Sequence, residues 1–154
     1  MRLLKGVIFF SLLMMIVASC APQGSLTPRS AFYDLRAAFQ QSDAAAFERL
    51  LSQASYRKIR HITALFSRLN DRQHESLSAL YKIPQERLQK LSVREYLKIL
   101  LAMDRGRDVI GAAVSQRIVG INREGNRAVI RVENGMELAF VKEGPYWKID
   151  LTEL

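Results

Sequence analysis

Hydrophobic residues between positions 28 and 110 recur at intervals of three and four, the spacing of α-helices that bury one face. Charged and polar residues occupy most of the positions between them, which is typical of helices with the opposite face in water. The residues expected on the buried helical faces are Phe32, Leu35, Phe39, Phe47, Leu50, Leu51, Ile59, Ile62, Phe66, Leu69, Leu77, Leu80, Leu97, Leu100, Leu101 and Met103.

Residues that favour helix ends divide this region into several predicted helices. Starts are expected at Thr27-Pro28, Ser42-Asp43, Ser55 and the capping box Ser92–Glu95. A break or a kink is expected at Asn70-Asp71 and helix ends at Pro84 and Gly106, with one short helix over residues 85–90.

From about Ser115 the hydrophobic period changes from 3.6 to 2, which predicts β-strands with one buried face. Glycine-containing turns at regular spacing separate four such strands, so the strands should form an antiparallel meander. The residues expected to point toward the core are Val119, Ile121, Ala128, Ile130, Val132, Met136, Leu138, Phe140, Trp147, Ile149 and Leu151.

Directly opposed residues in a sheet share a face, and this requirement predicts the three turns. A left-handed Gly135 is expected in the second turn, and Pro145 should begin the last strand. The register also places Arg131 opposite Glu137, a favourable cross-strand pair. The predicted pairs are Ile121 with Ala128 around Glu124-Gly125, Val132 with Met136 around residues 133–135, and Phe140 with Trp147 around Glu143-Gly144.

Helices followed by strands predict an α+β fold, with N-terminal helices packed on one face of a C-terminal four-stranded antiparallel meander. Residues 28–154 are expected to form a single domain, with helices over 28–110 and strands over 115–151.

The first twenty residues have the pattern of an export signal. Arg2 and Lys5 precede an apolar run of thirteen residues, Gly6–Ala18, which is interrupted only by Ser11. As a helix this run would span about 20 Å, whereas the hydrocarbon core of a bilayer needs about 30 Å. The run therefore predicts a signal peptide and disfavours a permanent transmembrane helix.

The signal ends in Val17-Ala18-Ser19-Cys20, and Cys20 is the only cysteine of the chain. This motif resembles the lipobox of bacterial lipoproteins. The resemblance implies cleavage between Ser19 and Cys20, removal of residues 1–19, and a diacylglyceryl thioether on Cys20. An ordinary signal peptide with a chance cysteine, or an uncleaved signal anchor, are the alternatives.

Residues 20–27 are expected to form the lipidated cysteine and a flexible tether, because proline, glycine and serine with little apolar content cannot pack a core. The domain should then lie close to a membrane surface. By resemblance to enteric lipoprotein sorting, Ala21 after the cysteine implies the outer membrane, with the domain facing the periplasm.

The 154 residues include 23 basic and 15 acidic side chains, a formal net charge of +8. Residues 57–127 hold 15 basic against 7 acidic side chains, whereas residues 128–154 hold 3 against 5. A basic helical face suits an anionic neighbour, so a protein or an anionic envelope component is the expected partner. Nucleic acid is not expected as a partner outside the cytoplasm. The alternative is a solvated arginine-rich surface.

Three segments of the domain resemble the nuclear-transport-factor-2-like, or cystatin-like, fold. They are residues 35–47, Leu91–Tyr96 and Gly144–Ile149. Many members have strand-like sequence after the second helix, whereas residues 56–81 here have a helical pattern. The resemblance implies a conical pocket between sheet and helices, but this family is functionally mixed and implies no activity.

The sequence holds no catalytic or metal-binding motif. His61 and His74 lack metal-site spacing, and no G-x-S-x-G motif is present, so no metal, no cofactor and no enzymatic activity are expected. The predicted function is a membrane-anchored, non-enzymatic lipoprotein. A carrier or sensor of small hydrophobic ligands is the alternative, with Tyr96, Phe140 and Trp147 as possible pocket-lining residues. An isomerase using Tyr96, Tyr146 or His61 is a third hypothesis.

Overall fold

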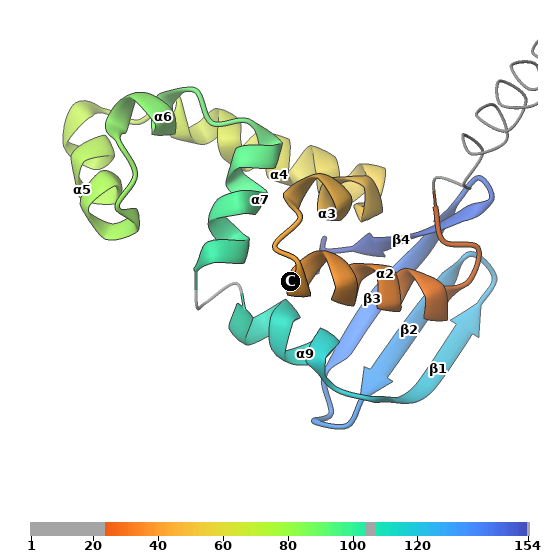
Figure 1. Ribbon diagram of the computed structural model, residues 1–154. Helices are drawn as coiled ribbons and strands as arrows, with labels where there is room; N and C mark the ends of the chain where they lie inside the picture. The colour runs from red at the N-terminus through yellow and green to blue at the C-terminus, as the bar shows by residue number, and fades with distance from the viewer. Residues whose placement is uncertain (1–23, 104–106, 154) are drawn as a thin grey trace, which may run out of the picture.

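Four antiparallel strands form one sheet at the C-terminal end of the chain, and the helices all precede them in sequence (Figure 1). The computed structural model describes residues 24–103 and 107–153. The predicted signal peptide, Cys20 and the helix end at Gly106 lie outside these residues. The elements are α2 (Pro28–Gln40), α3 (Ala44–Leu50), α4 (Gln53–Phe66), α5 (Asp71–Tyr81), α6 (Gln85–Gln89), α7 (Val93–Ala102), the π-helix η1 (Arg107–Gly111), α9 (Ala112–Ser115), β1 (Ile118–Glu124), β2 (Arg127–Val132), β3 (Glu137–Glu143) and β4 (Tyr146–Asp150).

The helix starts agree with the capping residues in three of the four predicted cases. Thr27 caps α2, Asp43 caps α3, and Ser92 forms a reciprocal capping box with Glu95 at the start of α7. The predicted start at Ser55 is wrong, because Ser52 caps α4 three residues earlier. Ser55 is buried in the first turn, where its hydroxyl oxygen accepts the Leu151 N–H at 2.7 Å.

The sheet has the order β1-β2-β3-β4, which confirms the predicted α+β fold and its antiparallel meander. The second hairpin has the predicted register: Val132 N–H donates to the Met136 carbonyl at 3.0 Å, and Gly135 has a φ of +82°. Arg131 pairs with Glu137 across the two strands, with their charged atoms 2.6 Å apart.

The first and third hairpins differ from the predicted register by two residues. Ile121 lies opposite Ile130, and Phe140 lies opposite Ile149. The loops are therefore Gly125-Asn126 and Gly144-Pro145, each with a glycine of φ +59° at its first position. A glycine in that position is typical of type II′ turns, whose twist suits a hairpin. Because the shift is even, it does not by itself change which residues of a strand face the core.

One inward-facing prediction in β1 is wrong. The register shifts between Ile118 and Gly120, and Val119 is 59% exposed. An extra residue at such a bulge reverses the side-chain alternation on its far side. Ile118 and Ile121 consequently pack against the core.

The core lies between the inner face of the sheet and helices α2, α3 and α7. Phe32 and Leu35 of α2 are fully buried, as are Ile130, Phe140 and Trp147 of the sheet. These side chains belong to one continuous cluster. The sheet therefore holds helix α2 through apolar packing, which is the dominant favourable contribution to such a fold.

The outer edge of β4 is covered by two short segments. Trp147 N–H donates to the Ser25 carbonyl at 2.8 Å, and Ser52 N–H donates to the Ile149 carbonyl at 2.9 Å. Ser25 is 3% exposed, and its hydroxyl donates to the Asp34 carboxylate at 2.5 Å. The predicted tether therefore does not extend to Thr27, because the segment from Gly24 onward is fixed on the sheet.

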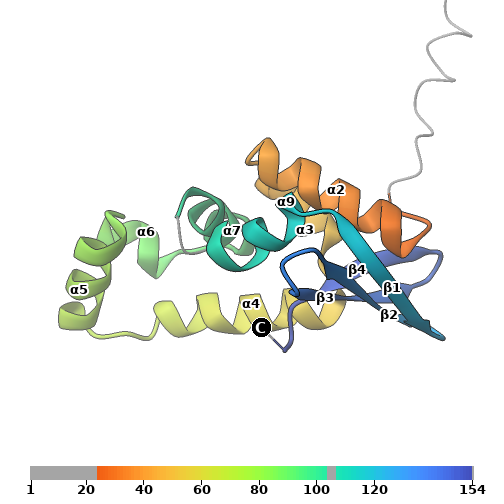
Figure 2. The same ribbon diagram turned by 90° about the horizontal axis from the view of Figure 1, so that it is seen from below.

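Helices α5 and α6 lie at the end of the molecule away from the sheet, beyond the far end of α4 (Figures 1 and 2). They pack mainly on each other. Leu88 and His74 are buried there, outside the main core cluster. We call residues 67–91 the helical arm.

Helices η1 and α9 were not expected from the sequence, although their residues fall near the end of the predicted helical region. Arg36 of α2 explains how the short α9 is held. Its guanidinium donates to the carbonyls of Val114 and Gln116, at the C-terminal end of α9. None of the helices within residues 24–103 and 107–153 combines the length and apolar character that crossing a membrane requires.

Candidate functional site

The three sequence-predicted pocket residues lie in different surroundings. Phe140 and Trp147 are 0% and 1% exposed and belong to the packed core, so they are not available to a ligand. Tyr96 is half-buried on α7, with its ring 6.4 Å from that of Phe66. Burial, and secondarily Tyr81, raises the pKa of Tyr96. None of these three side chains lines one of the hollows described below, and Phe140 and Trp147 lie where the sheet and helices pack on each other.

The residues of the isomerase hypothesis also lie in different surroundings. Tyr146 packs against Gly24 at the edge of the sheet, whereas His61 is exposed on α4. The residues that the structure describes contain no group of three or more His, Cys, Asp or Glu side chains that could hold a metal ion.

Three arginines of the sheet region pair with glutamates of the same region, whereas Arg123 lies over the ring of Trp147. Three ion pairs of 2.6–2.7 Å join Arg117 to Glu133, Arg127 to Glu153 and Arg131 to Glu137. The hydrogen bond from Arg117 lowers the pKa of Glu133, so this carboxylate stays charged to lower pH than usual. Residues 117–153 hold six basic and six acidic side chains, so the sheet region carries no net positive charge.

Helix α4 differs, because it contains basic residues and no acidic ones. Arg57, Arg60 and His61 are exposed at helical spacing, and Arg68 is exposed in the turn that follows. Among the residues that the structure describes, none of these arginines forms an ion pair. We call these four residues the α4 basic stripe; Ser55, Ile59 and Thr63 face the interior on the opposite side.

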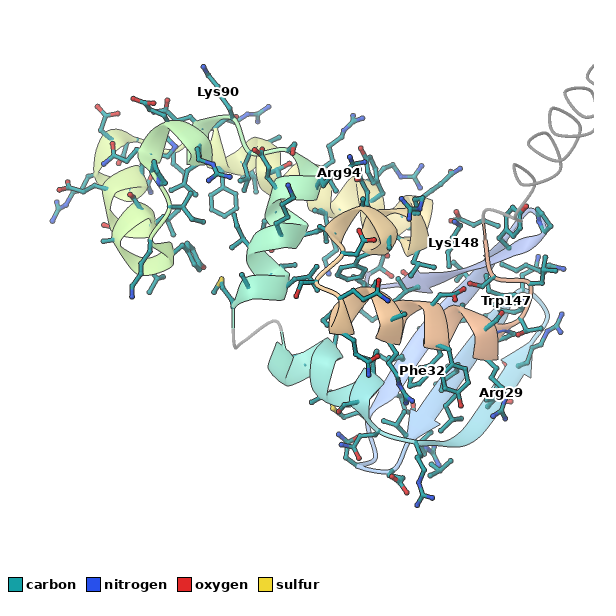
Figure 3. The ribbon with its side chains drawn as sticks, viewed as in Figure 1. Arg29, Phe32, Lys90, Arg94, Trp147 and Lys148 are labelled. Carbon is teal, nitrogen blue, oxygen red and sulfur yellow. The ribbon has the colours of Figure 1, made fainter. Side chains whose placement is uncertain are left out.

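Two other basic side chains of this region are held by the protein itself. Lys58 Nζ donates to the carbonyls of Leu151 and Thr152, at 3.2 and 3.0 Å. Arg94 pairs with Glu48 at 2.7 Å and joins α7 to α3. Figure 3 shows Arg94 and Lys90 on the helical side of the molecule, away from Arg29 and Trp147.

A hollow of about 390 Å³ lies next to the stripe, on the helical arm. Five residues line it: Leu69, Arg72, Gln73, Ser76 and Leu77. We call it the α5 groove. Leu80, one helical turn further along α5, is 69% exposed. Leu80 was predicted to be buried, and its exposure means that this face of α5 has no covering element among the described residues.

His74 fixes α5 to the end of α4 from beneath the groove. The side chain is 2% exposed, and its Nε2 is 2.7 Å from the Phe66 carbonyl. A carbonyl only accepts, so Nε2 carries the proton. Nδ1 has no hydrogen-bond partner. The histidine therefore has a structural role in the arm.

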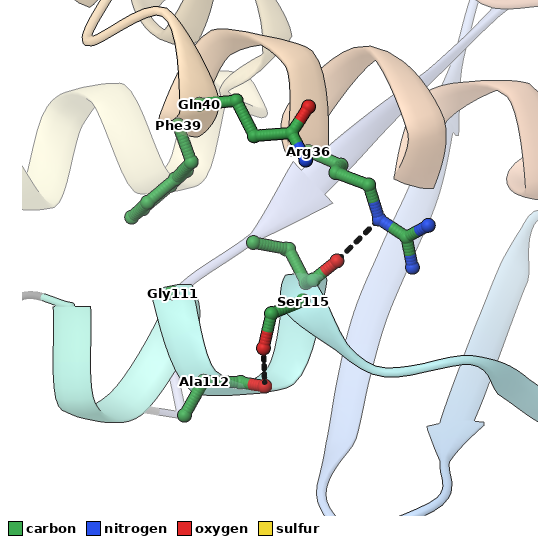
Figure 4. Close-up of a pocket in the computed structure, with 7 residues that line it drawn as sticks. Arg36, Phe39, Gln40, Gly111, Ala112 and Ser115 are labelled. Atoms are coloured by element: carbon green, nitrogen blue, oxygen red, sulfur yellow. Dashed lines mark hydrogen bonds between the residues drawn. The ribbon is translucent and has the colours of Figure 1, made fainter.

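A second hollow, of about 380 Å³, lies between α2 and the η1–α9 segment (Figure 4). Arg36 lines it, but the guanidinium is committed to the carbonyls at the end of α9. It also lies 5.1 Å from the ring centres of Phe32 and Tyr33. This arrangement uses Nε and one terminal nitrogen of the guanidinium to hold the helix end in place.

A third hollow, of about 480 Å³, lies on the outer face of the sheet beside Val119 and Gly120. Its charged residues, Arg131 and Glu137, neutralise each other. The α4 basic stripe and the α5 groove differ from this hollow, because their arginines form no ion pair among the described residues.

No protein-family model, curated protein or solved structure matches this chain. The likeness to the nuclear-transport-factor-2-like fold stays a prediction from the sequence. The residues that departed from that pattern, 56–81, are helical over almost their whole length.

Proposed function

We propose that this protein is a non-enzymatic lipoprotein of the bacterial envelope. Lipid on Cys20 holds it at a membrane, and the α4 basic stripe binds an acidic protein or another anionic envelope component. By the resemblance of its export signal, the anchor lies in the outer membrane and the domain faces the periplasm.

The anchoring part of the proposal rests on residues 17–20 and on the physics of lipid attachment. One acyl chain holds a protein only marginally, whereas two or more give stable attachment. The multiply acylated cysteine implied by the lipobox meets this requirement. Between Cys20 and the fixed Gly24 only three residues intervene, so the domain would stay near the membrane surface.

The binding part rests on one observation: charge compensation differs between the two regions of the domain. The sheet arginines 117, 127 and 131 each pair with a glutamate, whereas Arg57, Arg60 and Arg68 pair with none among the described residues. Unpaired surface arginines of one sign attract an anionic partner over about a Debye length and offer it bidentate hydrogen bonds.

A charge-matched comparison tests the binding part. One variant carries Arg57→Gln, Arg60→Gln and Arg68→Gln; the control carries Arg117→Gln, Arg127→Gln and Arg131→Gln. Both lose three positive charges, but only the first loses unpaired ones. The lipidated proteins are added to envelopes lacking the native protein, and the retained fraction is measured at two salt concentrations. The Debye length is about 14 Å at about 50 mM salt and about 4 Å at about 500 mM salt, so charge attraction is strongly screened only in the second case.

The proposal predicts that the wild type and the control are retained in a salt-sensitive manner beyond what lipid alone gives. The stripe variant should show only the salt-independent retention due to lipid. Equal retention of all three proteins at both salt concentrations would mean that the α4 basic stripe is an ordinary solvated surface.

A further inference from the structure

Two leucines of α5, Leu77 and Leu80, lie one helical turn apart on the side of the helix that forms the groove. Leu69, in the turn just before the helix, also lines the groove, and the polar Gln73 lies between them. A partner helix that packs on such a face presents apolar residues at i, i+3, i+4 and i+7. The groove supplies the concave space, and Leu80 extends the apolar contact beyond it.

Charge is distributed unequally around α5. Arg72 lines the groove and Arg68 precedes it, whereas no acidic residue lines it. At 100° per residue, Asp71 and Glu75 lie on the opposite side of α5 from Gln73 and Leu80. Because Arg68 and Arg72 have no ion-pair partner among the described residues, the edge of the groove is positive, while Leu69 and Leu77 form the apolar part of its floor.

We propose that the α5 groove binds an amphipathic helix of a partner protein, with leucine-like residues in the groove and carboxylates on Arg68 and Arg72. This inference rests on the proposed function in one respect, the acidic character of the partner. The apolar contact involves Leu69, Leu77 and Leu80, which are not part of the α4 basic stripe. Charge complementarity selects the occupant: an acidic helix satisfies both the apolar floor and the two arginines.

A second copy of this chain fits less well. Contact between two α5 grooves would place Arg68 and Arg72 of both copies in one interface and leave Asp71 and Glu75 outside it. A membrane surface also fits less well, because Gln73 and Ser76 make the same face partly polar and no aromatic residue lines it.

Three fluorescent peptides test the proposal against the full lipoprotein in nanodiscs of neutral phosphatidylcholine. The first is an amphipathic helix with leucines at i, i+3, i+4 and i+7 and glutamates beside them. The second has lysines in place of the glutamates, and the third is a scrambled form of the first. Fluorescence anisotropy gives each dissociation constant.

The acidic helix should bind at least about tenfold more tightly than the lysine and scrambled peptides. Leu80→Glu should weaken this binding about tenfold, and Arg72→Glu should weaken it while strengthening binding of the lysine peptide. Glu75→Gln, on the far side of α5, is the matched control and should change nothing. Leu80 and Arg72 are exposed, so their variants should fold.

Several outcomes would overturn the inference. Equal binding of the acidic and scrambled peptides would mean attraction by charge alone, and binding of none would remove the groove as a helix site. If the wild type self-associates and Leu80→Glu does not, the groove binds a second copy of this chain. If the protein binds anionic vesicles and none of the peptides, the groove binds a membrane surface. The Arg57→Gln, Arg60→Gln variant should keep peptide binding, so failure of the stripe and failure of the groove are distinguishable.

Discussion

The backbone N–H of Trp147 donates to the carbonyl oxygen of Ser25 across 2.8 Å, and this bond joins the first described segment to the last strand. An unprotected edge strand invites pairing with other chains. Here two segments cover the outer edge of β4. Ser25 pairs with it at Trp147, and Ser52 donates its N–H to the Ile149 carbonyl two residues later. The start of the domain and the start of α4 therefore lie on the same edge of the sheet.

The closeness of Gly24 to Tyr146 gives a first prediction. A Cβ built at Gly24 would lie 2.6 Å from Cγ and Cδ1 of the Tyr146 ring, whereas a Cβ at Gly120 would meet nothing within 4 Å. Gly24→Ala should lower the free energy of unfolding by about 1–3 kcal/mol through overpacking. Gly120→Ala, the matched control, should change it by less than about 0.5 kcal/mol. Urea denaturation measures both, and equal losses would contradict the described position of residue 24.

Arg36 gives a second prediction, because it holds the end of α9 by bonds to two carbonyls. Arg36→Met should cost about 1.5–3 kcal/mol, the range for hydrogen bonds that involve a charged group. Amide hydrogen exchange should rise over residues 112–116 in particular. Arg29→Met on the same helix is exposed and should stay within about 0.5 kcal/mol of the wild type. A variant at Arg36 with unchanged exchange in α9 would show that other contacts hold this helix.

The capping box of α7 gives a prediction about pH. Hydrogen bonds from the Ser92 backbone and then its hydroxyl lower the pKa of Glu95. A lowered pKa in the folded state contributes stability above the ordinary pKa of glutamate, and this contribution is lost as pH falls through the lowered value. In Glu95→Gln the side chain stays neutral. The difference in unfolding free energy between wild type and Glu95→Gln should therefore be larger at pH 7 than at pH 3, as measured by urea denaturation at each pH. A difference that does not change with pH would contradict the role of the carboxylate.

Local chemistry allowed most of the fold to be predicted. The caps Thr27, Asp43 and Ser92 each satisfy free N–H groups with their own side chains, so the helix starts can be read from neighbouring residues. The three-residue turn ending at Gly135 is equally local. The two-residue shifts in the other hairpins could not be detected from alternation, because an even shift leaves every side chain on the same face.

Contacts between distant residues account for what the sequence could not predict. Helical periodicity predicts that Leu80 is buried, but no described element covers its face of α5. Whether Leu80 is buried depends on the position of the helical arm relative to the rest of the domain, which periodicity does not determine. The pocket expected at Phe140 and Trp147 required an open space above the sheet, which α2 fills with Phe32 and Leu35. Which arginines are free likewise depends on cross-strand neighbours such as Glu137.

The most direct measurement of the central claim is the mass of the N-terminal peptide from protein isolated with membranes, compared with that of Cys20→Ser. We expect a wild-type chain that begins at Cys20 and carries a diacylglyceryl group on its sulfur, and a variant that is unprocessed or free of membranes. A wild-type protein with an unmodified thiol at Cys20, or with residues 1–19 retained, would contradict the account.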